Sequence, residues 1–307
     1  MTADLARVFV QVIVPVLLVG GSGYLIGRAR PLDLSPIIAL SVSVLVPGVV
    51  FDSLARAALP RALLGRLLLH VMLQVAAIGA LALLAARLAG LRGSARGALL
   101  LAAMFPNSGN LGLPVALFAF GPAGLAIAGG WFAISAIHTH TLGVFIGAHA
   151  RAGVRAALRQ LPRRPITYAI AAGVAVNLTG WPLPAPIARA SQLLANGSVA
   201  VLLLLLGLQL ARLTFGEEAG GAALATAIRL LAAPPIAWLA GRLVGLEGTA
   251  LAVAVLQASM PTAVVAFLWA MEFDTRPALV SASVVLSTLA SVVTLTVLLA
   301  LLGGGGA

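Results

Sequence analysis

The sequence predicts an all-α polytopic membrane protein with ten transmembrane helices, arranged as two inverted five-helix repeats. Three observations predict this fold class: the composition, a series of ten apolar runs, and a repeat at an offset of 155 residues. Of the 307 residues, 61% are hydrophobic and 9% are charged, whereas a soluble domain carries about 25% charged residues. Ten helices of about 20 residues use about 200 residues, which leaves no room for a soluble catalytic domain.

The ten apolar runs define the expected spans. They fall at 8–29, 34–51, 62–89, 97–120, 123–149, 165–181, 187–211, 221–241, 249–271 and 278–302. The first run lacks the charged start and the small-residue cleavage site of a signal peptide, so we interpret it as a span. The second and sixth runs are short and contain prolines or polar residues, so they are the weakest of the ten.

Several function classes are excluded by composition and motif content. The chain has no cysteine, which excludes thiolate nucleophiles and Cys-ligated zinc or iron–sulfur sites. It has no H-E-x-x-H motif and no pair of carboxylates deep in a span, and its serines lack a recognisable base. We therefore expect no enzyme activity, no cofactor and no metal site.

The arginines indicate topology. All 19 cationic side chains are arginine, 8 acids oppose them, and the net charge is +11. The arginines lie between apolar runs, which indicates membrane orientation rather than binding of nucleic acid. With both termini on one side, that side holds six arginines and the other holds twelve. The positive-inside rule then predicts a multi-pass inner-membrane protein with both termini outside and a basic cytoplasmic loop at 151–164.

An internal repeat divides the chain into 1–150 and 165–307, on either side of that loop. Residues 84–106 and 239–261 are identical at eleven of 23 positions without a gap. The matches include Arg87/Arg242, Gly90/Gly245, Gly93/Gly248 and Pro106/Pro261. Because the offset corresponds to five helices, an odd number, the two halves must insert in opposite orientations. Inverted repeats with interrupted helices at matching places are typical of secondary transporters, which bind substrate near mid-membrane.

Spans four and nine are expected to be interrupted at matching places. The first break contains Pro106, Asn107, Ser108, Gly109, Asn110, Gly112 and Pro114. The second break contains Gln257, Ser259, Met260, Pro261 and Thr262. Proline removes a backbone donor and clashes with the preceding turn, and freed backbone groups inside a membrane must find partners. A plain proline kink is the alternative, but the density of breakers and amides favours a true break.

If the two breaks meet, four helix ends face one another. Free N–H groups near Asn110–Leu113 and Thr262–Val264 would form an anion site, since each helix N-terminus carries about half a positive charge. Free carbonyls around Ala103–Phe105 and Ala258–Met260 could hold a cation, or be satisfied by nearby amides and hydroxyls. We expect the twelve residues named in the two breaks to bind the substrate.

At these residues the chain resembles the auxin efflux carrier family, which contains the plant PIN carriers and bacterial relatives. The run from Pro106 to Pro114 is similar to the family's fourth-helix motif. Met260-Pro261-Thr262-Ala263, the hydroxyl-rich stretch 281–291 and Leu205-Leu206-Gly207-Leu208 are also similar to family segments, although Val199 and Ala200 replace a proline that is usual nearby.

The resemblance implies two inverted repeats with crossing broken helices four and nine. It implies elevator motion, in which helices 3–5 and 8–10 move against a scaffold of helices 1, 2, 6 and 7. It implies transport of small organic anions: auxin-like acids in plants, and dicarboxylates such as malonate or malate for bacterial members. By the motif, Pro106, Asn107, Asn110 and Pro261 carry over to the crossing. Membrane lipid and a second copy in a homodimer are the expected partners.

Four further residues are candidates for coupling or charge compensation. Asp52-Ser53-Leu54-Ala55-Arg56 resembles an acid–Ser–Leu–x–base element of the plant carriers. Arg229 lies about 13 Å into span eight at 1.5 Å per residue, where it could attract a substrate carboxylate, snorkel, or pair with Glu217 or Glu218. His138 could carry protons or be a hydrogen-bonded structural histidine.

The driving force stays open at this point. The coupling ion could be H⁺ or Na⁺, although the lack of mid-span carboxylates weakens a sodium site built from acidic side chains. The alternatives to an organic-anion carrier are a sodium-coupled symporter of bile-acid-like anions and a passive anion channel.

Overall fold

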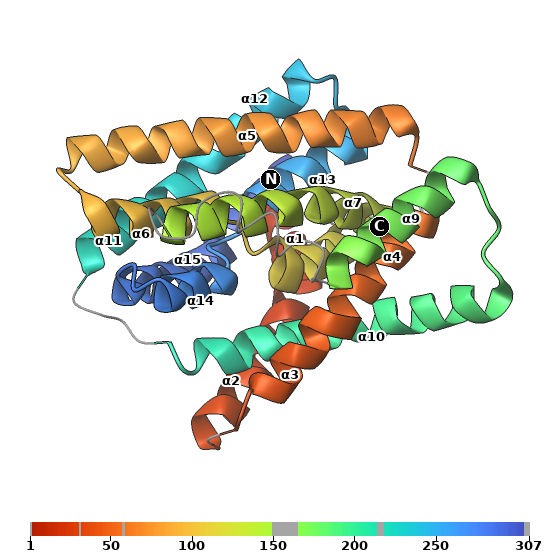
Figure 1. The fold of residues 1–307 in the computed structure, drawn as a ribbon, viewed down its shortest axis with the longest axis horizontal. Helices are drawn as coiled ribbons and strands as arrows, with labels where there is room; N and C mark the ends of the chain where they lie inside the picture. The colour runs from red at the N-terminus through yellow and green to blue at the C-terminus, as the bar shows by residue number, and fades with distance from the viewer. Residues whose placement is uncertain (1, 31, 57–58, 149–164, 214–217, 304–307) are drawn as a thin grey trace.

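The computed structural model describes residues 2–30, 32–56, 59–148, 165–213 and 218–303. Over these ranges the chain is helical and forms no β-strand, which confirms the all-α class (Figure 1). The helices are α1 (Thr2–Val8), α2 (Val14–Ala29), α3 (Ser35–Leu40), α4 (Val46–Arg56), α5 (Arg61–Leu88), α6 (Gly93–Met104), α7 (Leu113–Ala148), α9 (Pro165–Thr179), α10 (Ala185–Leu210), α11 (Ala219–Ala227), α12 (Ala233–Leu243), α13 (Gly248–Ala258), α14 (Val264–Glu272) and α15 (Pro277–Leu301).

The helices are long and apolar enough for a multi-pass membrane protein. Within the described ranges, seven helical segments of at least 18 residues meet the length and hydropathy of a membrane span. Three shorter apolar helices, α6, α9 and α13, lie in the regions of expected spans four, six and nine. The count of ten spans stays a prediction. The basic loop at 151–164 lies outside the described residues.

Four helical rods contain one wide π-helical turn, and each such turn ends two residues before a proline. The turns are Phe9–Ile13, Ser41–Leu45, Ser108–Gly112 and Ile228–Ala232, and the prolines are Pro15, Pro47, Pro114 and Pro234. A proline has no N–H and its ring displaces the carbonyl one turn earlier. A π-helical turn accommodates that displacement without ending the rod.

The helices pack in two groups. In the first group α2 lies along α10, and α4 packs against both α9 and α10. The second contains α5, α6, α7 and α11 to α15. Figure 1 shows α5 along one edge of the molecule and α10 along the opposite edge. Helices α2 and α10 touch through backbone, because a Cβ atom on Gly207 would collide with the carbonyl oxygen of Gly20.

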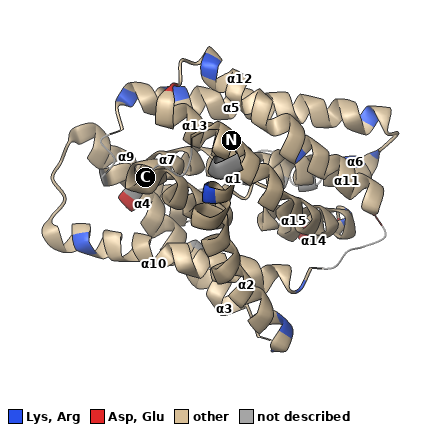
Figure 2. Ribbon diagram, turned by 180° about the vertical axis from the view of Figure 1, so that it is seen from behind, with Lys and Arg blue, Asp and Glu red and all other residues tan. Residues whose placement is uncertain are grey.

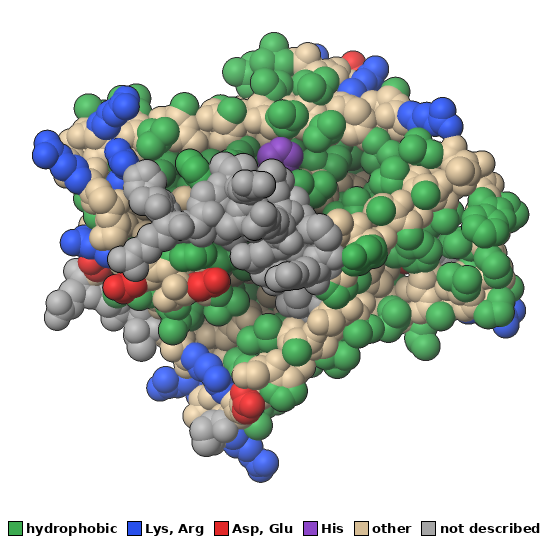
Figure 3. All heavy atoms as spheres, viewed as in Figure 1, with side chains coloured by type: hydrophobic (Ala, Val, Ile, Leu, Met, Phe, Trp, Pro, Cys, Tyr) green, Lys and Arg blue, Asp and Glu red, His purple; other side chains and the backbone are tan. Residues whose placement is uncertain are grey.

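The surface suits a lipid environment. Large apolar side chains point outward along the helices, among them Leu18, Leu25 and Leu193. The charged residues gather mainly at helix ends (Figure 2), and hydrophobic side chains cover much of the face shown in Figure 3. In a soluble protein, charged side chains are spread over the surface and large apolar side chains lie mainly inside. The opposite distribution here agrees with a multi-pass membrane protein.

The turns before the two breaks have the same backbone conformation. Gly90 and Gly245 have φ values of 68° and 73°, and Gly93 and Gly248 have φ values of 53° and 52°. Both pairs are separated by 155 residues, as are the ends of α5 and α12 and the starts of α6 and α13. The repeated glycines therefore occupy left-handed positions that other residues adopt at a cost.

Candidate functional site

The candidate site is a crossing of two extended segments at the centre of the fold. Phe105–Asn107 and Pro261–Ala263 run antiparallel, with Pro106 opposite Thr262. The N–H of Asn107 donates to the carbonyl oxygen of Pro261 at 2.7 Å, and the N–H of Ala263 donates to the carbonyl oxygen of Phe105 at 2.9 Å. Each segment therefore supplies a hydrogen-bond partner for a backbone group that would otherwise be unpaired, because the proline in the other segment interrupts its helix. The chain is broken here rather than kinked.

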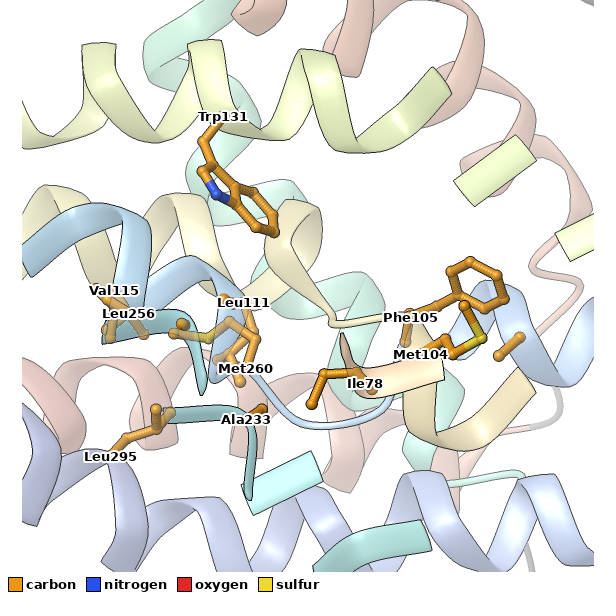
Figure 4. Close-up of a cluster of buried hydrophobic side chains, with 14 of the residues drawn as sticks. Ile78, Met104, Phe105, Leu111, Val115, Trp131, Ala233, Leu256, Met260 and Leu295 are labelled. Carbon is orange, nitrogen blue, oxygen red and sulfur yellow. The ribbon is translucent and has the colours of Figure 1, made fainter. Parts of the chain in front are cut away.

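Hydrophobic packing holds the crossing from several sides. Phe105, Leu111, Leu256 and Met260 are buried in one continuous core, and Figure 4 shows Leu111, Leu256 and Met260 gathered beside the turns of the broken helices. Phe105 also packs edge-to-face on Trp269 of α14, with ring centroids 5.4 Å apart. This packing encloses the backbone amides of the crossing in low-polarity surroundings.

Two helices begin at the crossing, slightly earlier than expected on one side. The carbonyl of Asn107 accepts from the N–H groups of Leu111 and Gly112. The N–H groups without an acceptor in the described structure are therefore those of Ser108, Gly109 and Asn110. The sequence predicted free N–H groups near Asn110–Leu113, so only Asn110 is common to both. The shift has a physical reason, because Pro106 ends α6 at Met104 and the next helical turn starts at once.

On the other side, helix α14 begins at Val264. Two of the expected donors are already used: the N–H of Thr262 donates to Ser287 Oγ at 3.0 Å, and that of Ala263 bonds across the crossing. Within the described structure, the N–H of Val264 has no acceptor. This helix start contributes positive dipole potential and fewer free donors than the start after Asn107.

Buried amides at the crossing have unused hydrogen-bonding groups. Asn107 is 5% exposed and its Nδ2 has no partner among the described residues. Gln257 is 0% exposed, and both its Oε1 and Nε2 lack partners there. The Gln257 amide lies against Gly112, where a Cβ atom would collide with it. Buried amides normally find partners, because leaving one unpaired costs about 1–3 kcal/mol.

Two of the remaining break residues, Ser259 and Thr262, use their hydroxyls in hydrogen bonds within the protein, and the others are buried or half-buried. The Ser259 hydroxyl donates to the carbonyl of Val255 at 2.6 Å, within its own helix. Thr262 Oγ1 donates to the carbonyl of Ala102 at 2.8 Å and so caps the end of α6. Ser108, Gly109, Pro114 and Met260 are buried, and Asn110 is half-buried.

Arg229 binds two of the carbonyls that the sequence predicted to be free at the crossing. Its Nη1 donates to Ala103 at 2.8 Å and its Nη2 donates to Ala258. Arg229 is 0% exposed, so it does not snorkel. Glu218 pairs instead with Arg276 at 3.1 Å, and Glu217 lies outside the described residues. The guanidinium is therefore bound by two carbonyl ends in the core and not by an acid among the described residues.

Ser287 is a site residue that the sequence analysis did not single out. Its hydroxyl on α15 accepts the N–H of Thr262 inside the crossing. The available signal was the spacing of Ser283, Ser287 and Ser291, which places three small hydroxyls on one helix face.

A cavity of about 240 Å³ adjoins the crossing between the two helix groups. Its wall is formed by α2 and α10 on one side and by α7 and α15 on the other, and Leu111 connects it to the helix start after Asn107. Apolar side chains dominate the wall, with Tyr24, Thr288 and Ser291 as polar members. No charged residue lines it among the described residues.

Of the four coupling or charge candidates, Arg229 lies at the crossing, whereas Asp52 and His138 make their hydrogen bonds elsewhere in the fold. Ser191 Oγ on α10 donates to Asp52 Oδ1 at 2.6 Å, so the Asp52 carboxylate joins α4 to α10. The Arg56 side chain lies outside the described part of the chain. The half-buried His138 has its Nδ1 3.0 Å from the carbonyl of Ile134, one turn earlier. No described group of three or more potential ligands could hold a metal ion.

The fold is that of a multi-pass membrane protein, and comparison with known proteins identifies it as a membrane transporter. The membrane transport protein family model matches residues 149–299. An uncharacterized transporter of Methanothermobacter thermautotrophicus is 30% identical over 266 residues, which is 86% of this chain and 87% of the archaeal protein.

Plant carriers match a shorter part of the chain. Auxin efflux carrier component 3a of Oryza sativa subsp. japonica is 32% identical over 139 residues, and component 1 of Arabidopsis thaliana is 31% identical over 137 residues. Each match covers 43% of this chain and 22% of the plant protein. The chain belongs to the auxin efflux carrier family, whose members are membrane transporters rather than enzymes.

Proposed function

We propose that this protein is a secondary active transporter of small organic carboxylate anions, with the substrate bound at the crossing. The observation that carries the proposal is the antiparallel pairing of Phe105–Asn107 with Pro261–Ala263. This pairing brings two helix N-termini to one place in the membrane. Free N–H groups of Ser108–Asn110, together with the Asn107 amide, are the donors that a carboxylate needs.

The unpaired amides support a binding role over a structural one. Asn107 and Gln257 bury hydrogen-bonding groups without partners in the described structure, which destabilises the protein. A carboxylate could accept from Asn107 Nδ2, and Gln257 Nε2 is a second donor nearby. Buried polar groups that lower stability inside a membrane protein are typical of a ligand-binding site.

The cavity favours an acid with an apolar body. A volume of about 240 Å³ is close to the lower end of small-molecule sites. Its apolar wall suits an aromatic or aliphatic group, and it offers no cationic side chain to a second carboxylate. Auxin-like acids therefore fit the cavity better than malonate or malate do.

Alternating access by an elevator motion is the mechanism that we propose. The scaffold would contain α1–α4, α9 and α10, and the moving part would contain α5–α7 and α11–α15. The cavity lies between these groups, and the close backbone approach of Gly20 to Gly207 joins α2 to α10 within the first group. The matching turns at an offset of 155 residues support two inverted five-helix repeats.

Loop contacts support the proposed grouping of loops on two opposite sides, while the orientation in the inner membrane rests on the distribution of arginines. Arg61 donates to the carbonyl of Leu178 and Arg66 donates to that of Gly245, so three loops assigned to the outer side touch one another. Arg276 and Glu218, assigned to the cytoplasmic side, form an ion pair. A homodimer with both termini outside completes the proposal.

Flux into proteoliposomes tests the function. We would measure uptake of labelled indole-3-acetate and malonate under separate sodium, proton and voltage gradients. The expected result is saturable uptake of indole-3-acetate that Asn107→Ala lowers at least about tenfold, since one charge-assisted hydrogen bond is worth about 1.5–3 kcal/mol. Asn196→Ala is the matched control, because Asn196 is an exposed amide on α10. Uptake in Asn107→Ala at the wild-type rate would remove the site assignment, and currents far above carrier turnover would indicate a channel.

A further inference from the structure

Arg229 is a fully buried cation that the anion site does not need as a direct ligand. It lies in the π-helical turn Ile228–Ala232, and its guanidinium donates one hydrogen bond to Ala103 and one to Ala258. Ala103 belongs to the last turn of α6 and Ala258 ends α13. The two carbonyls are separated by 155 residues, so one side chain binds equivalent positions of both repeats.

The charges at this place balance. Each helix C-terminus carries about half a negative charge, and a guanidinium stays protonated in proteins. Among the described residues no carboxylate pairs with Arg229, and its Nε has no hydrogen-bond partner. The positive charge is therefore compensated by the two helix ends rather than by an acid.

The same two carbonyl ends would otherwise form a cation site. Carbonyls at half-helix C-termini are the groups that coordinate Na⁺ in broken-helix transporters. Here the guanidinium already donates to one carbonyl of each half-helix. Thr262 Oγ1 binds a further carbonyl, that of Ala102, so groups of the protein itself bind three carbonyls at the ends of α6 and α13.

Only one of the two repeats supplies this charge, and it does so from a π-helical turn. Arg229 precedes Pro234, and the widened turn ends just before it. The residue at the equivalent position of the first repeat is Gln74, within the uninterrupted α5. Gln74 is buried, and both its amide atoms lack partners among the described residues. One cation thus serves both half-helices.

We infer that Arg229 is a built-in counter-cation: it neutralises the two carbonyl ends in place of a bound metal ion, so that the crossing binds a carboxylate without sodium. This inference rests on the proposed function. Arg229 acts through the helix ends and is a positioning residue. Without its charge, the negative helix ends would oppose the positive N-termini a few residues away.

Melting temperature tests the cation role without any transported substrate. The purified full chain would be unfolded in sodium chloride and in N-methylglucamine chloride of equal ionic strength. We expect the same melting temperature for the wild type in both salts. Arg229→Ala should have a lower melting temperature and recover most of the loss in millimolar guanidinium. Arg242→Ala, which removes an exposed arginine of α12, should show no recovery.

Transport kinetics test the link to the anion site. In sodium-free proteoliposomes, Arg229→Ala should raise the KM for indole-3-acetate about tenfold with a smaller change in kcat, because the two helix C-termini beside the anion site lose their compensating charge. Guanidinium should lower that KM again. Arg229→Lys, which keeps the charge, should stay near the wild-type KM, and Arg229→Met should not.

Each outcome decides the inference. Specific stabilisation of the wild type by sodium would overturn it, as would an Arg229→Ala protein with the wild-type KM and no response to guanidinium. If Arg229→Ala does not fold, the two other variants decide. A folded Arg229→Lys together with an unfolded Arg229→Met supports the role of Arg229 as a counter-cation, because only the lysine keeps the charge. A folded Arg229→Met with the wild-type KM refutes it. A wild-type protein that moves neither acid would refute the proposed function and leave the melting experiment valid.

Discussion

The main-chain N–H of Asn107 donates to the carbonyl oxygen of Pro261 at 2.7 Å, across two segments more than 150 residues apart in the sequence. Both segments are interrupted by a proline, and each provides a partner for a group that the other cannot satisfy alone. The bond aligns the helix start after Asn107 with the start of α14 at Val264. The anion site that we propose depends on this alignment.

Replacing Gln257 should raise the stability of the protein and lower its transport activity. Both polar atoms of this buried amide lack partners in the described structure, and an unpaired buried polar group costs about 1–3 kcal/mol. Gln257→Met keeps the volume and removes that cost. We expect a higher melting temperature together with slower uptake of indole-3-acetate. A lower melting temperature with unchanged uptake would show that the amide is structural.

Gly112 should not tolerate a methyl group. A Cβ atom at this position would collide with the Gln257 side chain, and both residues lie in the packed crossing. Gly112→Ala should lower stability by about 1–3 kcal/mol, the usual cost of overpacking. Adding Gln257→Ala should restore most of it, which a double-mutant cycle measures.

Gly65→Ala is the control for that cycle. Gly65 lies in α5, and a Cβ atom there meets nothing within 4 Å. Alanine is a better helix former than glycine, so this variant should be as stable as the wild type or more so. Equal losses in Gly112→Ala and Gly65→Ala would contradict the close contact at the crossing.

Ser287 should be needed to hold the second break. Its hydroxyl accepts the N–H of Thr262 at 3.0 Å, and both residues are buried. Ser287→Ala leaves that N–H without a partner, which costs about 1–3 kcal/mol. We expect a lower melting temperature and a raised KM. Ser283→Ala, one turn away and bonded only within α15, should keep the wild-type KM.

His70 and Trp131 should be structural. The Trp131 indole N–H donates to His70 Nδ1 at 3.0 Å, and His70 Nε2 lies 3.0 Å from the carbonyl of Ala237. The imidazole is therefore a neutral tautomer that joins α5, α7 and α12. Trp131→Phe should lower unfolding free energy by about 1–3 kcal/mol and leave the KM and its pH dependence unchanged. A new pH dependence in this variant would indicate that His70 carries protons.

The broken helices could be predicted because proline and glycine act locally. Pro106 and Pro261 remove donors wherever they lie, and the repeated Gly90/Gly245 pair fixes matching turns. The offset of 155 residues then predicted that the two breaks occupy equivalent positions in the two repeats. The all-α class followed from composition in the same direct way.

The partners at the crossing could not be predicted from local sequence. Arg229 binds carbonyls of Ala103 and Ala258, which carry no side-chain signal, and three distant segments must fold before these groups meet. The free N–H groups also lie at Ser108–Asn110 and not at Leu111–Leu113, because the carbonyl of Asn107 accepts from Leu111 and Gly112. Such competition among backbone acceptors is settled by packing.

A cryo-electron microscopy structure with bound indole-3-acetate tests the central claim most directly. The account predicts carboxylate density within hydrogen-bond distance of the Ser108–Asn110 N–H groups and of Asn107 Nδ2, with Arg229 still on the two carbonyl ends. Density for the carboxylate on Arg229 itself, or at a place remote from the crossing, would contradict it.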